Sequence, residues 1–289
     1  MVGKSWAVRR PLPPRREGRA ADEALMARRL GAPPNRALES REQVIGGVMC
    51  RVVGEPVPGG AIVIHLHGGG YRMGAPKDWV EFGHRLVAVT GAQVILPDYS
   101  LAPEKPFPNA IHDVIDILEE LTGKAEETPI ILSGDSAGGG LALATAGALT
   151  TPSALAGLIL ISPWLDLRII ADSYQRCAGT DPLFSSASAA ASAADYLQGW
   201  SADDPLASPL LGELDGLPPV CLFASSAEVL ADDSISLAQR LSLNGTPITS
   251  VIFPDLLHDW PVMDPQRPET AMFFEVVKTF SRQIFGLIK

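Results

Sequence analysis

A serine near the middle of the chain has the sequence environment of a nucleophile. Ser136 lies at the centre of Gly134-Asp135-Ser136-Ala137-Gly138, after the apolar run Ile130-Ile131-Leu132 and before the small-residue pattern 141–146. This order predicts a buried strand, a sharp turn and a helix, with the serine hydroxyl projecting from the carboxyl edge of a sheet. The glycines two residues to either side leave room for the helix to double back while Ser136 adopts a strained, positive φ. The chemistry that this arrangement favours is attack on a carbonyl carbon.

A second motif could stabilise the negative charge that such an attack creates. The apolar stretch 61–66 is typical of a strand buried on both faces, and it continues through His67 into Gly68, Gly69 and Gly70. Successive glycines leave main-chain amides free to turn toward an anion. The spacing matches neither the phosphate loop of nucleotide hydrolases nor the dinucleotide fingerprint. The glycines therefore favour an oxyanion hole over a phosphate site.

A serine nucleophile needs a neighbouring base, and the chain offers five histidines. His258 lies on a loop after the predicted strand 249–253, at the carboxyl edge of the sheet. It also follows the serine and the acid in the chain order of α/β hydrolases, which makes it the predicted base. The other four precede the serine and are expected to be structural: His65, His67, His84 and His112.

The acid that orients the base should follow the preceding strand, 220–224. Glu228, Asp232 and Asp233 compete for this role. Glu228 is favoured because it comes first after the strand. Asp232 and Asp233 precede the helical pattern that starts at Ser234, and we expect them to cap its N-terminus. A share of the acid role for Asp232 stays open.

Strands and helices alternate along most of the chain. Apolar or β-branched stretches predict strands at 44–53, 61–67, 93–97, 130–132, 158–161, 220–224 and 249–253. Helical patterns lie at 78–90, 110–121, 141–146, 234–243 and 272–284. The alternation predicts an α/β fold with a mainly parallel central sheet covered by helices on both faces. Sites in such sheets lie at the carboxyl ends of the strands.

Two segments interrupt this alternation. Residues 1–45 are expected to form an N-terminal arm with a short cap helix at 22–30. Residues 167–212 form an insertion between the two parts of the catalytic core, 46–166 and 213–289. The insertion contains an Ala/Ser run at 185–194, beside Tyr196 and Trp200. Because alanine favours helix, we expect a packed helix and a cap over the site.

Composition excludes several classes of protein. The chain has 289 residues, 46% of them hydrophobic, and 33 acidic side chains against 23 basic ones. This acidic balance argues against a nucleic-acid partner, although basic residues crowd the first thirty positions. No stretch predicts a secretory signal or a membrane span, so a cytoplasmic location is expected. The three cysteines, Cys50, Cys177 and Cys221, predict neither a metal site nor a disulfide framework.

Several motifs together resemble the hormone-sensitive-lipase-like family of carboxylesterases, also called bacterial family IV, within the α/β-hydrolase superfamily. The resemblance runs from about residue 62 to the C-terminus. The motifs that carry it are His67-Gly68-Gly69-Gly70, Asp98-Tyr99-Ser100-Leu101-Ala102-Pro103-Glu104, Gly134-Asp135-Ser136-Ala137-Gly138-Gly139, Ser162-Pro163-Trp164-Leu165-Asp166-Leu167, Asp204-Pro205-Leu206-Ala207-Ser208-Pro209-Leu210, Gly216-Leu217-Pro218-Pro219 and His258-Asp259-Trp260.

The resemblance implies a role for each site residue. Ser136 would be the nucleophile and His258 the base. The amides of Gly69, Gly70 and Ala137, with Gly68 as a further candidate, would form the oxyanion hole. Glu228 stands where the family usually has Asp, and a subgroup with Glu at this position carries the acid role over to it.

The implied activity is hydrolysis of short-chain carboxylic esters through an acyl-enzyme, with a small-molecule ester as substrate and no metal or organic cofactor. A lactone or another xenobiotic acyl compound is the alternative substrate class. A non-catalytic hydrolase-fold receptor is disfavoured, because receptors that resemble this family have lost the histidine that His258 represents. A homodimer is expected from family habit and from 249–253 as an exposed edge strand.

Overall fold

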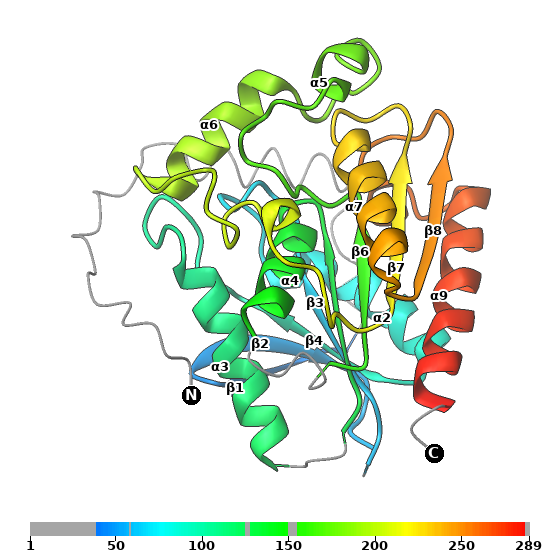
Figure 1. Ribbon diagram of the computed structural model, residues 1–289. Coiled ribbons are helices and arrows are strands. Elements are labelled where there is room, and N and C mark those ends of the chain that lie inside the picture. The colour runs from blue at the N-terminus through cyan, green and yellow to red at the C-terminus, as the bar shows by residue number, and fades with distance from the viewer. Residues whose placement is uncertain (1–38, 58, 125–127, 150–154, 287–289) are drawn as a thin grey trace.

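The computed structural model describes residues 39–57, 59–124, 128–149 and 155–286. Most of the predicted N-terminal arm, including the helix expected at 22–30, lies outside the described residues. Figure 1 shows the described chain as a central sheet between two layers of helices. The α/β architecture predicted from the sequence is therefore confirmed.

Eight strands of the described residues form one sheet, in the order β1-β2-β4-β3-β5-β6-β7-β8. Strands β3 to β8 are mutually parallel, whereas β2 pairs antiparallel with both β1 and β4. The strands are β1 (Arg41–Ile45), β2 (Val48–Val53), β3 (Ile62–Leu66), β4 (Gln93–Pro97), β5 (Ile130–Asp135), β6 (Gly157–Ile161), β7 (Val220–Ser225) and β8 (Ile248–Phe253). The inner strands β5, β6 and β7 are buried along their whole length, as continuous apolar runs predict.

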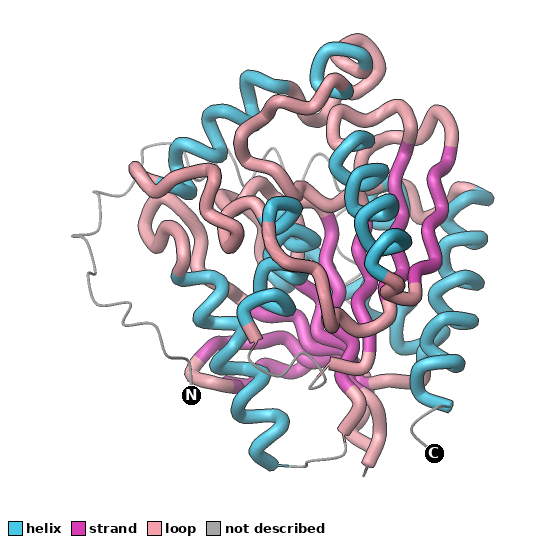
Figure 2. Tube along the Cα trace, viewed as in Figure 1, coloured by secondary structure: helices cyan, strands magenta, loops and turns pink. Residues whose placement is uncertain are grey.

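Helices cover both faces of the sheet and bury an apolar core against each. Helices α2 (Val80–Thr90) and α9 (Pro268–Gly286) pack together on one face. The opposite face carries α3 (Asn109–Lys124), α4 (Ala137–Ala148) and α7 (Ala231–Asn244), and Figure 2 shows the same layering by element type. The amphipathic patterns read from the sequence arise from this one-sided burial.

The remaining short helices lie in connections around the carboxyl ends of the strands. The segment predicted as a cap lies at the top of the view in Figure 1, where it forms α5 and α6. These elements are η1 (Pro76–Trp79), α5 (Ser173–Arg176), α6 (Ser186–Leu197), η3 (Pro209–Leu211) and α8 (Trp260–Met263). Ser185 caps α6 by accepting a hydrogen bond from the amide of Ser188, so the Ala/Ser run is a helix, as predicted.

The N-terminal part of the sheet corrects two boundaries. The stretch 44–53, predicted as one strand, is a hairpin in which Gly46 and Gly47, both with positive φ, join β1 to β2. Residues 41–45 therefore belong to the sheet, and the predicted end of the arm at residue 45 is too late. The glycine pair was the overlooked turn signal, because both positions need a conformation that glycine adopts without strain.

The connection from β5 to α4 depends on glycine at close contacts. A Cβ added to Gly138 would overlap the carbonyl oxygen of Leu66 on β3, and one added to Gly134 would overlap the carbonyl of Gly138. Because these contacts are with backbone, no side chain can move aside to relieve them. The steric reason predicted for both glycines is confirmed.

The substitution Gly138→Ala tests this contact. We expect it to lower the free energy of unfolding by about 3 kcal/mol, because the new methyl group must push α4 away from β3. Gly147→Ala is the matched control: it lies in the same helix, and an added Cβ there has no neighbour within 4 Å. It should stabilise the protein by about 0.5 to 1 kcal/mol. Urea unfolding of both variants measures the difference, and equal stabilities would contradict the expectation.

Candidate active site

Ser136 sits on a strained turn at the carboxyl end of β5. Its backbone has φ 52° and ψ −119°, and the residue is buried. Its amide donates to the carbonyl of Ile161 at 2.9 Å, and its own carbonyl accepts from Trp164 at 2.9 Å. These bonds to the end of β6 and the following loop hold the turn in place, so the hydroxyl projects from the sheet edge as predicted.

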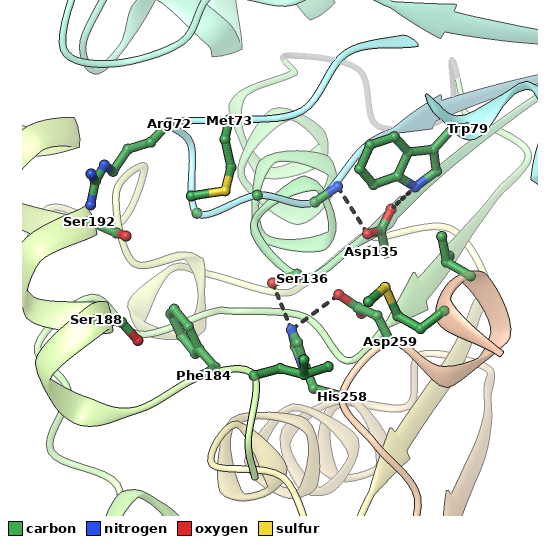
Figure 3. Close-up of a pocket in the computed structure, with 16 residues that line it drawn as sticks. Arg72, Met73, Trp79, Asp135, Ser136, Phe184, Ser188, Ser192, His258 and Asp259 are labelled. Atoms are coloured by element: carbon green, nitrogen blue, oxygen red, sulfur yellow. Dashed lines mark hydrogen bonds and ion pairs between the residues drawn. The ribbon is translucent and has the colours of Figure 1, made fainter. Parts of the chain in front are cut away.

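Three strand ends bring together Ser136, His258 and Glu228. Nε2 of His258 lies 2.9 Å from Oγ of Ser136 (Figure 3), and Nδ1 lies 2.6 Å from Oε2 of Glu228. The other oxygen of Glu228 accepts from the amide of Ser225 at 2.8 Å, which fixes the carboxylate at the end of β7. Serine, imidazole and carboxylate thus form a continuous hydrogen-bonded chain, the arrangement that activates a serine hydroxyl.

The two competing acids are bound elsewhere. Asp232 forms an ion pair with Arg176 and accepts from the amide of Ser173 at 2.8 Å. Asp233 accepts from the amides of Leu165 and Asp166 at 2.8 and 3.1 Å.

The predicted N-cap role of these two acids is wrong. Helix α7 begins at Ala231, with Leu230 as its N-cap, so both aspartates lie inside the first turn. Their carboxylates instead tie α7 to the connections that follow β6.

The glycine loop keeps two of its three predicted oxyanion donors free. The amide of Gly68 donates to Oδ2 of Asp135 at 2.9 Å, so it is not free to act as an oxyanion donor in this structure. Gly69 and Gly70 have φ values of 122° and 62°, and, among the described residues, their amides have no hydrogen-bond acceptor. Ala137 is the first residue of α4, where helix amides lack a partner within the helix.

Asp135 organises this loop, a role that the sequence reasoning missed. Besides the Gly68 amide, it accepts from Nε1 of Trp79 at 3.0 Å, and its Oδ1 lies 3.1 Å from Nε2 of His65. Both carboxylate oxygens are therefore occupied. Its place beside Ser136 was the available signal, but which loops it binds depends on the fold.

Three of the histidines expected to be structural contact residues of the surrounding fold. His65 contacts Ser133 through Nδ1 at 3.0 Å, and the ring of His67 stacks on Tyr99 with centroids 4.4 Å apart. Nε2 of His84 bonds to the carbonyl of Glu39 at 2.8 Å. All three cysteines are buried free thiols, and Cys221 lies in the core as predicted.

A cavity of about 220 Å³ opens beside the Ser136 hydroxyl. The predicted cap contributes part of the lining of this cavity. One of its residues, Phe184, stacks nearly parallel to the ring of His258, with centroids 6.0 Å apart. Helix α6 is held over the glycine loop by Tyr196, whose ring stacks on Tyr71 at 3.9 Å. The lining comprises Gly68, Gly69, Gly70, Arg72, Met73, Trp79, Asp135, Ser136, Leu183, Phe184, Ser188, Ser192, His258, Asp259, Val262 and Met263.

A second carboxylate approaches His258 from the cavity. Oδ2 of Asp259 lies 3.1 Å from Nε2, the nitrogen that also faces Ser136 (Figure 3). Burial raises the pKa of Asp259 to about 7, although His258 opposes the rise. Burial lowers the pKa of His258, but the carboxylates of Asp259 and Glu228 outweigh it and hold that pKa well above its ordinary value. Asp259 adjoins His258 in sequence, yet only the left-handed backbone at Asp259 turns the carboxylate this way.

Asp259→Asn should lower the pKa of His258. A carboxylate stabilises the imidazolium form, so removing its charge shifts the titration midpoint of His258 to lower pH by at least about one pH unit. NMR titration of the ring protons measures the midpoint, with His258→Gln to assign the signal. The signal of His84, on α2, serves as the internal control. An unchanged midpoint for His258 would contradict the coupling.

The described residues contain neither a metal-binding cluster nor a membrane-spanning helix. Within them, no group of three or more His, Cys, Asp or Glu side chains has an arrangement that could hold a metal ion. Likewise, none of the helices in the described ranges combines the length and apolarity that a membrane crossing requires.

Comparison with known proteins gives consistent matches. Residues 63–262 match the family model described as alpha/beta hydrolase fold. An acetyl-hydrolase of Streptomyces hygroscopicus is 34% identical over 89% of this chain and 85% of its own length. An esterase of Acinetobacter venetianus is 30% identical over 87% and 84%. A crystal structure of an esterase from the bacterial hormone-sensitive lipase family superposes with a TM-score of 0.85 at 30% identity, covering 94% of this chain and 93% of that one. The chain therefore belongs to the α/β-hydrolase family and, as its motifs indicated, resembles the esterases of the hormone-sensitive-lipase branch.

Proposed function

We propose that this protein is a serine carboxylesterase that hydrolyses short-chain carboxylic esters. The observation that carries the proposal is the hydrogen-bonded chain from Ser136 through His258 to Glu228, at the mouth of a cavity. Relatives named esterase and acetyl-hydrolase support the reaction class. The contact between His258 and Ser136 argues against a non-catalytic receptor.

The first half of the reaction forms an acyl-enzyme. The Ser136 hydroxyl attacks the ester carbonyl carbon while Nε2 of His258 takes its proton. The negative charge that develops on the carbonyl oxygen is stabilised by the amides of Gly69, Gly70 and Ala137. Glu228 stabilises the imidazolium and keeps the Nδ1 proton in place without accepting it. His258 then gives its proton to the departing alcohol as the tetrahedral intermediate collapses.

The second half repeats these steps with water. His258 takes a proton from a water molecule, whose oxygen attacks the acyl-enzyme carbonyl. The same amides hold the second oxyanion. Return of the proton to the Ser136 oxygen releases the carboxylic acid and restores the free enzyme.

Substitution of the three side chains tests their roles. Ser136→Ala should lower kcat/KM for p-nitrophenyl butanoate by about 10⁵-fold or more, because the nucleophile is lost. Glu228→Gln should lower it by about 10³- to 10⁴-fold, because the amide no longer holds the productive tautomer of His258. Asp232→Asn is the control, since its carboxylate binds Arg176 and Ser173. It should retain activity within about threefold, and equal losses in the Glu228 and Asp232 variants would overturn the assignment of the acid.

The size of the cavity supports the preference for short chains. Its volume of about 220 Å³ lies below the roughly 300–1,000 Å³ of pockets that enclose drug-sized ligands. We expect kcat/KM for p-nitrophenyl acetate and butanoate to exceed that for the octanoate by about tenfold or more, because the longer acyl chain cannot be enclosed. An octanoate preference would contradict the short-chain assignment while leaving the esterase chemistry intact.

We also propose that the protein forms a homodimer through β8. This strand is one of the two edges of the described sheet, and Thr249, Ser250 and Ile252 on it are exposed. An uncovered edge can pair with the same strand of a second copy. Sedimentation velocity at micromolar concentration should give twice the chain mass, and a single monomeric species would contradict the proposal.

A further inference from the structure

Asp259 occupies a helix N-cap but does not act as a cap. It precedes the short helix α8, where an aspartate usually accepts a hydrogen bond from the helix amides, and its side chain makes no such bond. The backbone carbonyl accepts from the amides of Val262 and Met263, each at 3.0 Å, so the main chain is fixed. With φ 56° and ψ 32°, the backbone directs the carboxylate into the cavity instead.

One oxygen of this carboxylate is left for a ligand. Oδ2 contacts Nε2 of His258 at 3.1 Å, whereas Oδ1 is buried and lacks a hydrogen-bond partner among the residues that the structure describes. The whole residue is only 8% exposed. Leaving a buried acceptor unpaired is costly, so a donor that reaches this carboxylate from the cavity would be bound. Asp135, the other carboxylate of the lining, differs because both of its oxygens are occupied.

The proposed reaction decides which part of a substrate meets Asp259. Nε2 of His258 must come within hydrogen-bond distance of the leaving oxygen, about 3 Å, to protonate it. Since Oδ2 of Asp259 is equally close to that nitrogen, the alcohol part of the ester must pass beside this carboxylate. Figure 3 places Asp259 on the Trp79 side of His258, opposite Phe184 and Ser188 of the cap segment.

We propose that Asp259 selects esters whose alcohol part carries a hydrogen-bond-donating hydroxyl close to the ester oxygen, such as monoesters of diols and polyols. This inference rests on the proposed esterase function. A neutral donor fits better than a cation, because the imidazolium that forms at His258 already balances the charge of the carboxylate. Aliphatic alcohols would leave Oδ1 unpaired.

Two esters that differ by one group test the selection. 2-Hydroxyethyl butanoate and propyl butanoate share the acyl part and have equal chain length, with a hydroxyl in place of a methyl. In the wild type, kcat/KM should favour the hydroxyethyl ester by at least about tenfold, the size expected for a hydrogen bond to a charged acceptor. Asp259→Leu should bring the ratio close to one. Because both esters are measured on the same enzyme, any change in the basicity of His258 cancels from the ratio.

A control variant and a second ester substrate distinguish a failure of this inference from a failure of the proposed esterase function. Asp264→Asn, outside the cavity lining at the end of α8, should keep the wild-type ratio. If Asp259→Leu fails to fold, Asp259→Asn, which keeps the shape and loses the charge, should lower the ratio at least about threefold. A wild-type ratio near one, or a ratio unchanged in the soluble Asp259 variant, overturns the inference alone. Failure of the wild type to hydrolyse either ester or p-nitrophenyl butanoate overturns the proposed function.

Discussion

The close contact between helix α4 and strand β3 is the constraint on which the site depends. Gly138 lets the helix backbone touch the carbonyl of Leu66, and the helix can therefore start directly after Ser136. Any side chain at that position would force α4 outward and relax the strained turn. The strain at Ser136 is maintained by its surroundings, because its amide is bonded to the end of β6 and its carbonyl to the loop after β6 and to α4.

Asp135 connects the strained turn at Ser136 to the glycine loop after β3. It is the last residue of β5, and it binds the Gly68 amide, the Trp79 indole and the His65 ring at once. The loop after β3 is thereby fixed relative to the serine. The energetic cost of burying the carboxylate is offset by these hydrogen bonds. The amides of Gly69 and Gly70, which have no acceptor within the described residues, then lie in a loop that is already fixed, and the proposed oxyanion stabilisation requires such a fixed loop.

His258 lies between two carboxylates that have different surroundings. Glu228 is fully buried and receives a second bond from the Ser225 amide, so it is a fixed partner of Nδ1. Asp259 faces the cavity and shares Nε2 with Ser136. In the proposed reaction, Glu228 orients the ring and Asp259 touches the nitrogen that transfers the proton. The proposal therefore links the basicity of His258 and the contact with the alcohol part at one residue, Asp259.

Local sequence was sufficient for the alternating strands and helices and for the elbow at Ser136, because periodicity and glycine spacing are properties of neighbouring residues. The roles of Ser136, Glu228 and His258 were predicted from their order along the chain and stay predictions. Glu228 was favoured over Asp232 by its distance from the strand, and the hydrogen bond to His258 follows that order. Three features could be found only in the tertiary structure. They are the hydrogen bond from the Gly68 amide to Asp135, the start of α7 at Ala231 and the direction of the Asp259 carboxylate. Each depends on which loops meet at the carboxyl edge of the sheet, and sequence spacing does not encode contacts between loops far apart in the chain.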